Sequence, residues 1–131
     1  MYNANVVQCA SVSATMDILA EPGLYERQRA VGDRLAAGLR RLAGEAGIPV
    51  RVEGLSTVFQ MWFTEHPIRN WRDAERHADE AAFTRWWQEM LLRGVMFHPS
   101  QFENLFVSLV HSDADVDETL AKAREAFAAL S

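Results

Sequence analysis

The 131-residue sequence is poor in cysteine and lysine, with one of each, and it has no long apolar run. With Cys9 alone, an internal disulfide and a zinc site built from cysteines are both excluded, which favours a reducing, cytoplasmic location. No apolar stretch reaches the roughly 20 residues that a membrane-spanning helix needs, and no basic segment at the start indicates a secretory signal. The net charge of −5, with acids and bases intermixed, argues against binding to nucleic acids or anionic membranes.

Motifs that carry chemistry are equally scarce. The sequence contains neither a Gly-x-Ser-x-Gly nucleophile motif nor a glycine-rich phosphate-binding loop. The histidines, His66, His77, His98 and His111, are never four residues apart, the spacing that places two imidazoles on one helical face for a metal. Motifs alone therefore predict no metal site and no catalytic residue.

Hydrophobic residues make up 49% of the sequence and include four tryptophans, so the chain can form one packed domain and is not disordered. Small apolar residues from Asn5 to Leu19 predict a helix that Asn5 caps and that packs closely against a partner. We predict that Cys9, within this helix, is buried and unreactive.

The apolar pattern beyond this helix changes its period once. From Leu24 to Leu42, apolar residues recur at steps of seven, four, four and three, which predicts an amphipathic helix that starts at Pro22 and ends at Gly47. Further elements are predicted as strands at residues 50–53, 57–63, 95–97 and 105–110, and as helices at residues 71–76, at 79–93 and from Ser112 onward.

This order of elements predicts an α+β fold, in which a small, mainly antiparallel sheet is covered on one face by helices. The nearly continuous apolar character of residues 105–110 favours a central position for that strand. Trp86 and Trp87 are predicted to lie in the core rather than to form a stacking surface for a ligand.

Eight short stretches resemble, in their order and spacing, the C-terminal part of class III aminotransferases that use pyridoxal phosphate (PLP). The matching stretches are residues 2–5, 21–27, 32–35, 46–50, 56–59, 93–103, 106–108 and 111–112. The branch that they resemble most is glutamate-1-semialdehyde 2,1-aminomutase. The resemblance covers nearly the whole chain.

The resemblance implies a fold-type I homodimer in which residues 21–131 form the C-terminal small domain. Residues 1–20 would be a helix that ends the missing large domain. A threonine of this family reaches the cofactor phosphate of the neighbouring subunit, but its matching position is Met1, which cannot make that contact. Val6 stands where the family usually has proline.

The resemblance also implies a substrate-entrance segment, which matches the stretch from Ser100 to Glu103. In the family a glutamate of this segment helps to shape the substrate site, so Glu103 is the best carried-over position. Many ω-amino transaminases place a carboxylate-binding arginine in this region. This sequence has Phe102, Glu103 and Asn104 instead, which favours the aminomutase branch.

PLP chemistry needs a lysine that forms a Schiff base with the cofactor. Lys122 is the single candidate, and it is turned away from the apolar face of the last predicted helix. The parent enzyme is therefore expected to use PLP, whereas residues 1–131 alone are expected to bind no cofactor and to be catalytically silent.

Three functions remain open at this point. The chain is the C-terminal segment of an aminomutase-like aminotransferase, within a reading frame that extends upstream of Met1, or it is a free-standing protein-interaction module derived from that domain. The third possibility is a small enzyme that uses His98 and Glu103. Exposed apolar surface on the first helix and the sheet predicts self-association, as a homodimer or larger, or binding to the missing large-domain portion.

Overall fold

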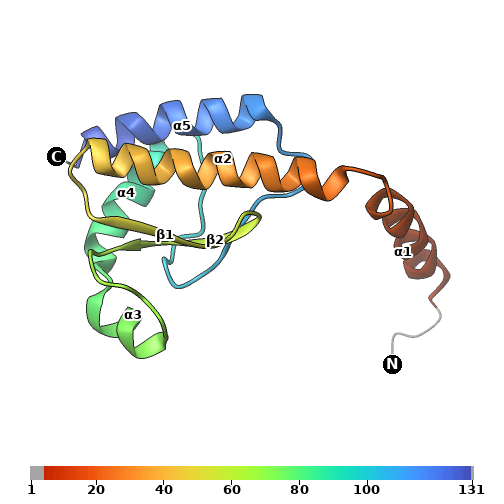
Figure 1. The fold of residues 1–131 in the computed structure, drawn as a ribbon, viewed down its shortest axis with the longest axis horizontal. Coiled ribbons are helices and arrows are strands. Elements are labelled where there is room, and N and C mark those ends of the chain that lie inside the picture. Colours follow the sequence, from red (N-terminus) through yellow and green to blue (C-terminus); the bar gives the residue numbers. More distant parts are fainter. Residues whose placement is uncertain (1–4, 131) are drawn as a thin grey trace.

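The structure, a computed structural model, describes residues 5–130 as five helices and a three-stranded sheet (Figure 1). In chain order the elements are α1 (Val6–Leu19), α2 (Leu24–Glu45), β1 (Val50–Leu55), β2 (Val58–Phe63), α3 (Trp71–His77), α4 (Glu80–Leu92), β3 (Leu105–Phe106) and α5 (Asp113–Ala128). Figure 1 shows α2 and α5 side by side over one face of the sheet, with α3 on the other side. The predicted α+β fold is confirmed.

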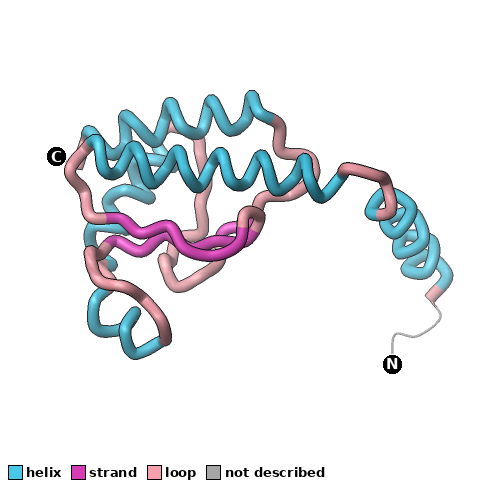
Figure 2. The backbone as a smooth tube through the Cα atoms, in the orientation of Figure 1, coloured by secondary structure: helices cyan, strands magenta, loops and turns pink. Residues whose placement is uncertain are grey.

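The sheet has the strand order β1-β2-β3, and both pairings are antiparallel. The β1–β2 hairpin forms as predicted, with Val50 opposite Phe63 and Leu55 opposite Val58. Figure 2 shows that this hairpin contains the long strands and that most of the chain between α4 and α5 is loop.

Two strand predictions between α4 and α5 are wrong. Residues 105–110 were expected to form a central strand, but β3 is two residues long and lies at the edge of the sheet. Residues 95–97 form no strand, because their backbone bonds to α4 instead. The Val95 N–H donates to the Met90 carbonyl at 3.0 Å, and the Phe97 carbonyl accepts from the Trp87 indole at 2.8 Å. An apolar run thus marks burial here and not strand pairing.

The core lies between β2 and the helices. Phe59, Met61 and Phe63 alternate along β2 and are buried on the helical face of the sheet. Trp86 of α4 is fully buried beside them, with its ring centroid 5.5 Å from that of Phe127 on α5. The core position predicted for Trp86 is confirmed, whereas Trp87 is only half-buried.

Helix α2 begins later than predicted and is packed closely through two glycines. It starts at Leu24 because Gly23 adopts a left-handed conformation with φ of 77°. A Cβ atom at Gly32 would lie 1.9 Å from the Ser56 carbonyl oxygen, and one at Gly38 would lie 2.5 Å from the Leu120 side chain. These glycines therefore let α2 approach the β1–β2 turn and α5.

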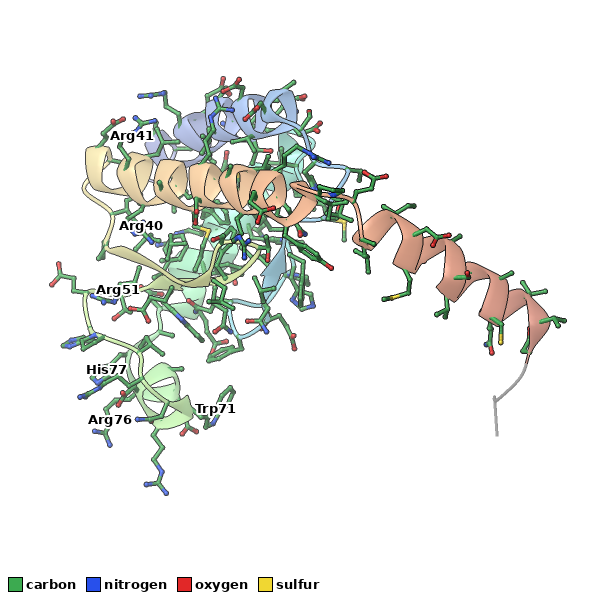
Figure 3. All side chains as sticks on the ribbon, turned by 45° about the vertical axis from the view of Figure 1, so that its right-hand side comes forward. Arg40, Arg41, Arg51, Trp71, Arg76 and His77 are labelled. Carbon is green, nitrogen blue, oxygen red and sulfur yellow. The ribbon has the colours of Figure 1, made fainter. Side chains whose placement is uncertain are left out.

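Helix α1 projects away from the rest of the chain, and none of its residues is buried (Figures 1 and 3). The Asn5 side chain caps it as predicted, accepting from the backbone N–H groups of Val7 and Gln8. The prediction that Cys9 is buried is wrong for this chain, because the thiol is exposed. Within residues 5–130, no helix combines the length and the apolar character needed to cross a membrane.

Candidate functional site

The two predicted entrance residues, Ser100 and Glu103, lie in one turn between α4 and β3. The Glu103 N–H donates to the Ser100 carbonyl at 3.3 Å, and the Ser100 hydroxyl accepts from the Phe102 N–H at 3.2 Å. Ser100 is half-buried and Glu103 is exposed. The structure thus brings both residues together and presents the Glu103 side chain to solvent.

Two glutamines attach this turn to β2. Gln101 is 2% exposed, and its side-chain oxygen accepts from the Phe63 N–H at 3.2 Å. From the middle of β2, the Gln60 amide donates to the Phe102 carbonyl at 3.0 Å. Sequence reasoning missed both glutamines, because a polar residue in a loop carries no sign that it is buried. The Gln101 Nε2 atom is buried and has no hydrogen-bond partner among the described residues.

An aromatic cluster packs against Phe102 of this turn. The Phe102 ring meets Trp62 edge-on, with 5.7 Å between centroids, and lies 5.1 Å from the Trp71 ring. Trp71 begins α3 and is exposed, as Figure 3 shows. Since Gln60 and Trp62 face away from the helical core, this cluster covers the second face of the sheet. The turn that carries Glu103 is therefore held in place by the hydrogen bonds of the two glutamines and by the aromatic contacts of Phe102.

The four histidines make local contacts. The rings of His66 and His77 stack with 4.2 Å between centroids. His98 Nδ1 accepts from the Ser100 N–H at 3.2 Å, and His111 Nδ1 accepts from the Ser108 N–H at 3.0 Å. In the described part of the chain, histidine, cysteine and acidic side chains form no group of three that could hold a metal ion.

The start of α5 is a charged, well-capped helix end. Asp115 accepts from both the backbone N–H and the hydroxyl of Ser112, at 2.8 and 2.7 Å. These hydrogen bonds, the backbone bond first, hold the pKa of the Asp115 carboxyl below its usual range, and the nearby His111 acts in the same direction. Arg34 of α2 pairs with Asp113, which ties the two helices together.

Lys122 is the single lysine of the sequence. It lies on α5 with its Nζ 2.5 Å from the Glu118 carboxylate, one helical turn away, and its side chain is 28% exposed. A Schiff-base lysine must reach a cofactor, whereas the Lys122 side chain pairs with a carboxylate of its own helix. That residues 1–131 alone bind no PLP stays a prediction.

Comparisons with known proteins give consistent results at the levels of sequence and fold. No protein-family model matches the chain. The chain is 43% identical over 129 residues, 95% of its length, to the glutamate-1-semialdehyde 2,1-aminomutase of Deinococcus deserti. It is 36% identical over 128 residues, 98% of its length, to the enzyme of the same name from Desulfosudis oleivorans. It spans only 29% and 30% of the lengths of these two relatives.

Solved structures of PLP transaminases share the fold. A transaminase with PLP bound superposes with a TM-score of 0.69 at 20% identity, over 86% of this chain and 24% of that one. The FumI protein of Sphingopyxis sp. MTA144, in its PLP internal aldimine form, gives a TM-score of 0.68 at 29% identity, over 88% of this chain and 25% of that one. The predicted resemblance to class III PLP-dependent aminotransferases is confirmed along the chain. Met1 and residues 2–4, which belong to the first of the eight matching stretches, lie outside the described residues.

Proposed function

We propose that this chain is the C-terminal part of an aminomutase-like class III aminotransferase, an enzyme that transfers an amino group with PLP. The observation that carries the proposal is the pattern of coverage. Nearly the whole chain aligns with aminomutases at 43% and 36% identity, yet it accounts for less than a third of each of them. In such an enzyme the remaining polypeptide would bind PLP and supply the Schiff-base lysine.

Within the parent enzyme, residues 21–131 would form the small domain and residues 1–20 the helix that ends the large domain. The composition of α1 supports this division. Its only charged residue is Asp17, and apolar side chains such as Val6, Val12 and Ile18 point outward with 51–81% of their surface exposed. A helix that is apolar on all sides is normally buried. We therefore propose that the large domain and a second subunit cover α1.

The turn from Ser100 to Glu103 would face the substrate entrance of that enzyme. Its supports are the two glutamines and the aromatic cluster, which hold the backbone while Glu103 stays exposed. A carboxylate on a fixed backbone can select the position of a substrate ammonium group. In this proposal the rest of the enzyme binds the cofactor, and Glu103 acts only in the assembled protein.

The proposal predicts the coding sequence upstream of Met1. An open reading frame is expected there, encoding a glycine directly before the threonine position that Met1 occupies and a cofactor lysine farther upstream. Sequencing the genomic region tests this directly. A stop codon immediately upstream of Met1, behind a separate promoter, would contradict the proposal and favour a free-standing interaction module.

A second prediction concerns cofactor binding by residues 1–131 alone. Purified chain mixed with PLP is expected to show no absorbance band of an internal aldimine, because Lys122 is held by Glu118. The variant Lys122→Ala serves as the matched control and is expected to give the same spectrum. An aldimine band that disappears in Lys122→Ala, together with turnover, would show that the chain is an enzyme by itself.

A further inference from the structure

An apolar cavity of about 470 Å³ opens beside the free edge of β3. Its inner wall is formed by Leu35 of α2, Phe59 of β2 and Val116 of α5. Its two sides are the chain at residues 95–99 and the chain at residues 104–107. The cavity therefore reaches the core and is flanked by two segments that form no helix.

The segment at residues 104–107, which contains β3, has an unpaired edge. The Val107 N–H donates to the Thr57 carbonyl of the β1–β2 turn at 2.9 Å, and the Val107 carbonyl accepts from the Gln28 side chain of α2 at 2.7 Å. Because alternate residues of a strand direct their N–H and C=O groups to opposite sides, those of Phe106 point away from β2. Among residues 5–130, no strand pairs with this side of β3.

The other segment, residues 95–98, forms no strand and also lines the cavity. Its side chains alternate, with Val95 and Phe97 half-buried and Met96 and His98 exposed. Val95 and Phe97 use their backbone bonds on α4. The N–H and C=O of Met96 have no partner in the described part of the chain, so hydrogen-bonding groups are free on both flanks of the cavity.

Large apolar side chains surround the cavity on the outside. Met96 is 78% exposed, Phe106 is 69% exposed and Val110 is 87% exposed. An open strand edge next to exposed apolar residues is a typical site for the addition of an extended segment.

We infer that an extended segment of the parent polypeptide, outside the part that this chain represents, docks between β3 and residues 95–98 as an added strand. The inference rests on the proposed function. The chain spans 29% and 30% of its aminomutase relatives, so most of such an enzyme lies outside it. A segment tethered to the same chain has a high effective concentration at this site.

The geometry also defines the chemistry of this segment. A strand places every second side chain on one face, so apolar residues at alternate positions would fill the space lined by Leu35, Phe59 and Val116. A second copy of the chain is the alternative occupant, but it lacks the high effective concentration of a segment tethered to the same polypeptide.

Peptide binding tests this inference. Overlapping synthetic peptides would cover the part of the Deinococcus deserti aminomutase that this chain does not match, and each would be titrated into the labelled 131-residue chain by fluorescence anisotropy. One stretch with alternating apolar residues is expected to bind. Methylation of its backbone amides is expected to weaken binding by about tenfold or more, since main-chain hydrogen bonds provide much of the affinity in strand addition.

The matched variants are Met96→Pro and Phe106→Pro against Met96→Ala and Phe106→Ala. At Phe106, proline removes an N–H that points away from β2, a position where edge strands tolerate it. At Met96, proline removes the N–H of a segment outside the sheet. Alanine keeps the N–H at both positions and shortens the side chain. The proline variants are expected to lose peptide binding and the alanine variants to keep most of it. Circular dichroism of all four variants confirms that each remains folded.

Three outcomes would overturn the inference. The first is an absence of peptide binding, and the second is peptide binding that the proline variants do not change. The third is dimerisation of the chain that the proline variants abolish while no peptide binds. This third outcome would identify a second copy as the occupant. A failure of peptide binding leaves the upstream reading frame unaffected, so it is distinguishable from a failure of the proposed function.

Discussion

Replacing Trp86 by alanine is expected to lower the free energy of unfolding by about 4 kcal/mol, a large part of the stability of a domain of this size. The Trp86 side chain is fully buried, and its ring lies 5.1 Å from Phe97 and 5.5 Å from Phe127 between centroids. Its removal leaves a cavity where α4, α5 and residues 95–98 meet. Urea unfolding followed by far-UV circular dichroism measures the loss.

The matched control is Trp71→Ala, which removes the same side chain from a position that is 63% exposed. Trp71 contacts Phe102 with 5.1 Å between ring centroids, and aromatic pairs of this kind contribute about 1 kcal/mol. Equal losses for the two variants would show that Trp86 is not the centre of the core. The small loss expected for Trp71→Ala would be accompanied by faster amide exchange in the Ser100–Glu103 turn.

Replacing Gly32 by alanine is the second large effect, with an expected loss of about 3 kcal/mol in the free energy of unfolding. The added methyl group would lie 1.9 Å from the Ser56 carbonyl oxygen. That atom belongs to the backbone of the β1–β2 turn, so either the turn or α2 must shift. The same urea experiment measures the change.

Gly44→Ala is the control for this prediction, because Gly44 lies in the same helix and the added methyl group would meet no atom within 4 Å beyond the helix's own neighbouring residues. Alanine is the better helix former, so this variant is expected to gain about 0.5 kcal/mol. Opposite signs for the two substitutions would confirm the close packing of α2 on the hairpin. A gain in stability for Gly32→Ala would show that the turn does not touch α2.

Along the chain, the turn at Ser100–Glu103 lies between the two segments that line the cavity beside β3, residues 95–99 and 104–107. The turn carries the carboxylate that we propose for the substrate entrance, and the segments beside the cavity offer backbone groups for an added strand. A strand docked at residues 95–98 would hold the segment that leads directly into the turn. The missing polypeptide would thus complete the fold at the point where the small domain meets the substrate.

The candidate site was predictable only in part. The resemblance led to Ser100 and Glu103, and a turn of four residues brings them together through local hydrogen bonds. Gln101 and Trp71 were not predictable, because their roles depend on β2 and α3 being folded against the turn. Burial of a polar side chain is decided by neighbours that are distant in sequence.

The sequence by itself determined the features that depend on neighbouring residues. The apolar stripe of α2, the Asn5 cap and the Ser112–Asp115 capping box all follow from side chains within a few residues of each other. The β1–β2 hairpin is also local, since a short turn joins two alternating segments.

Only the tertiary structure decided the fate of the two apolar runs after α4. Residues 95–97 and 105–110 have the composition of strands, but a strand exists only where another segment supplies hydrogen bonds. In the first run, the Val95 N–H and the Phe97 carbonyl form hydrogen bonds with α4. In the second run, only Leu105 and Phe106 pair with β2. The exposure of α1 is likewise a tertiary result, since no residue of this helix is buried against the rest of residues 5–130.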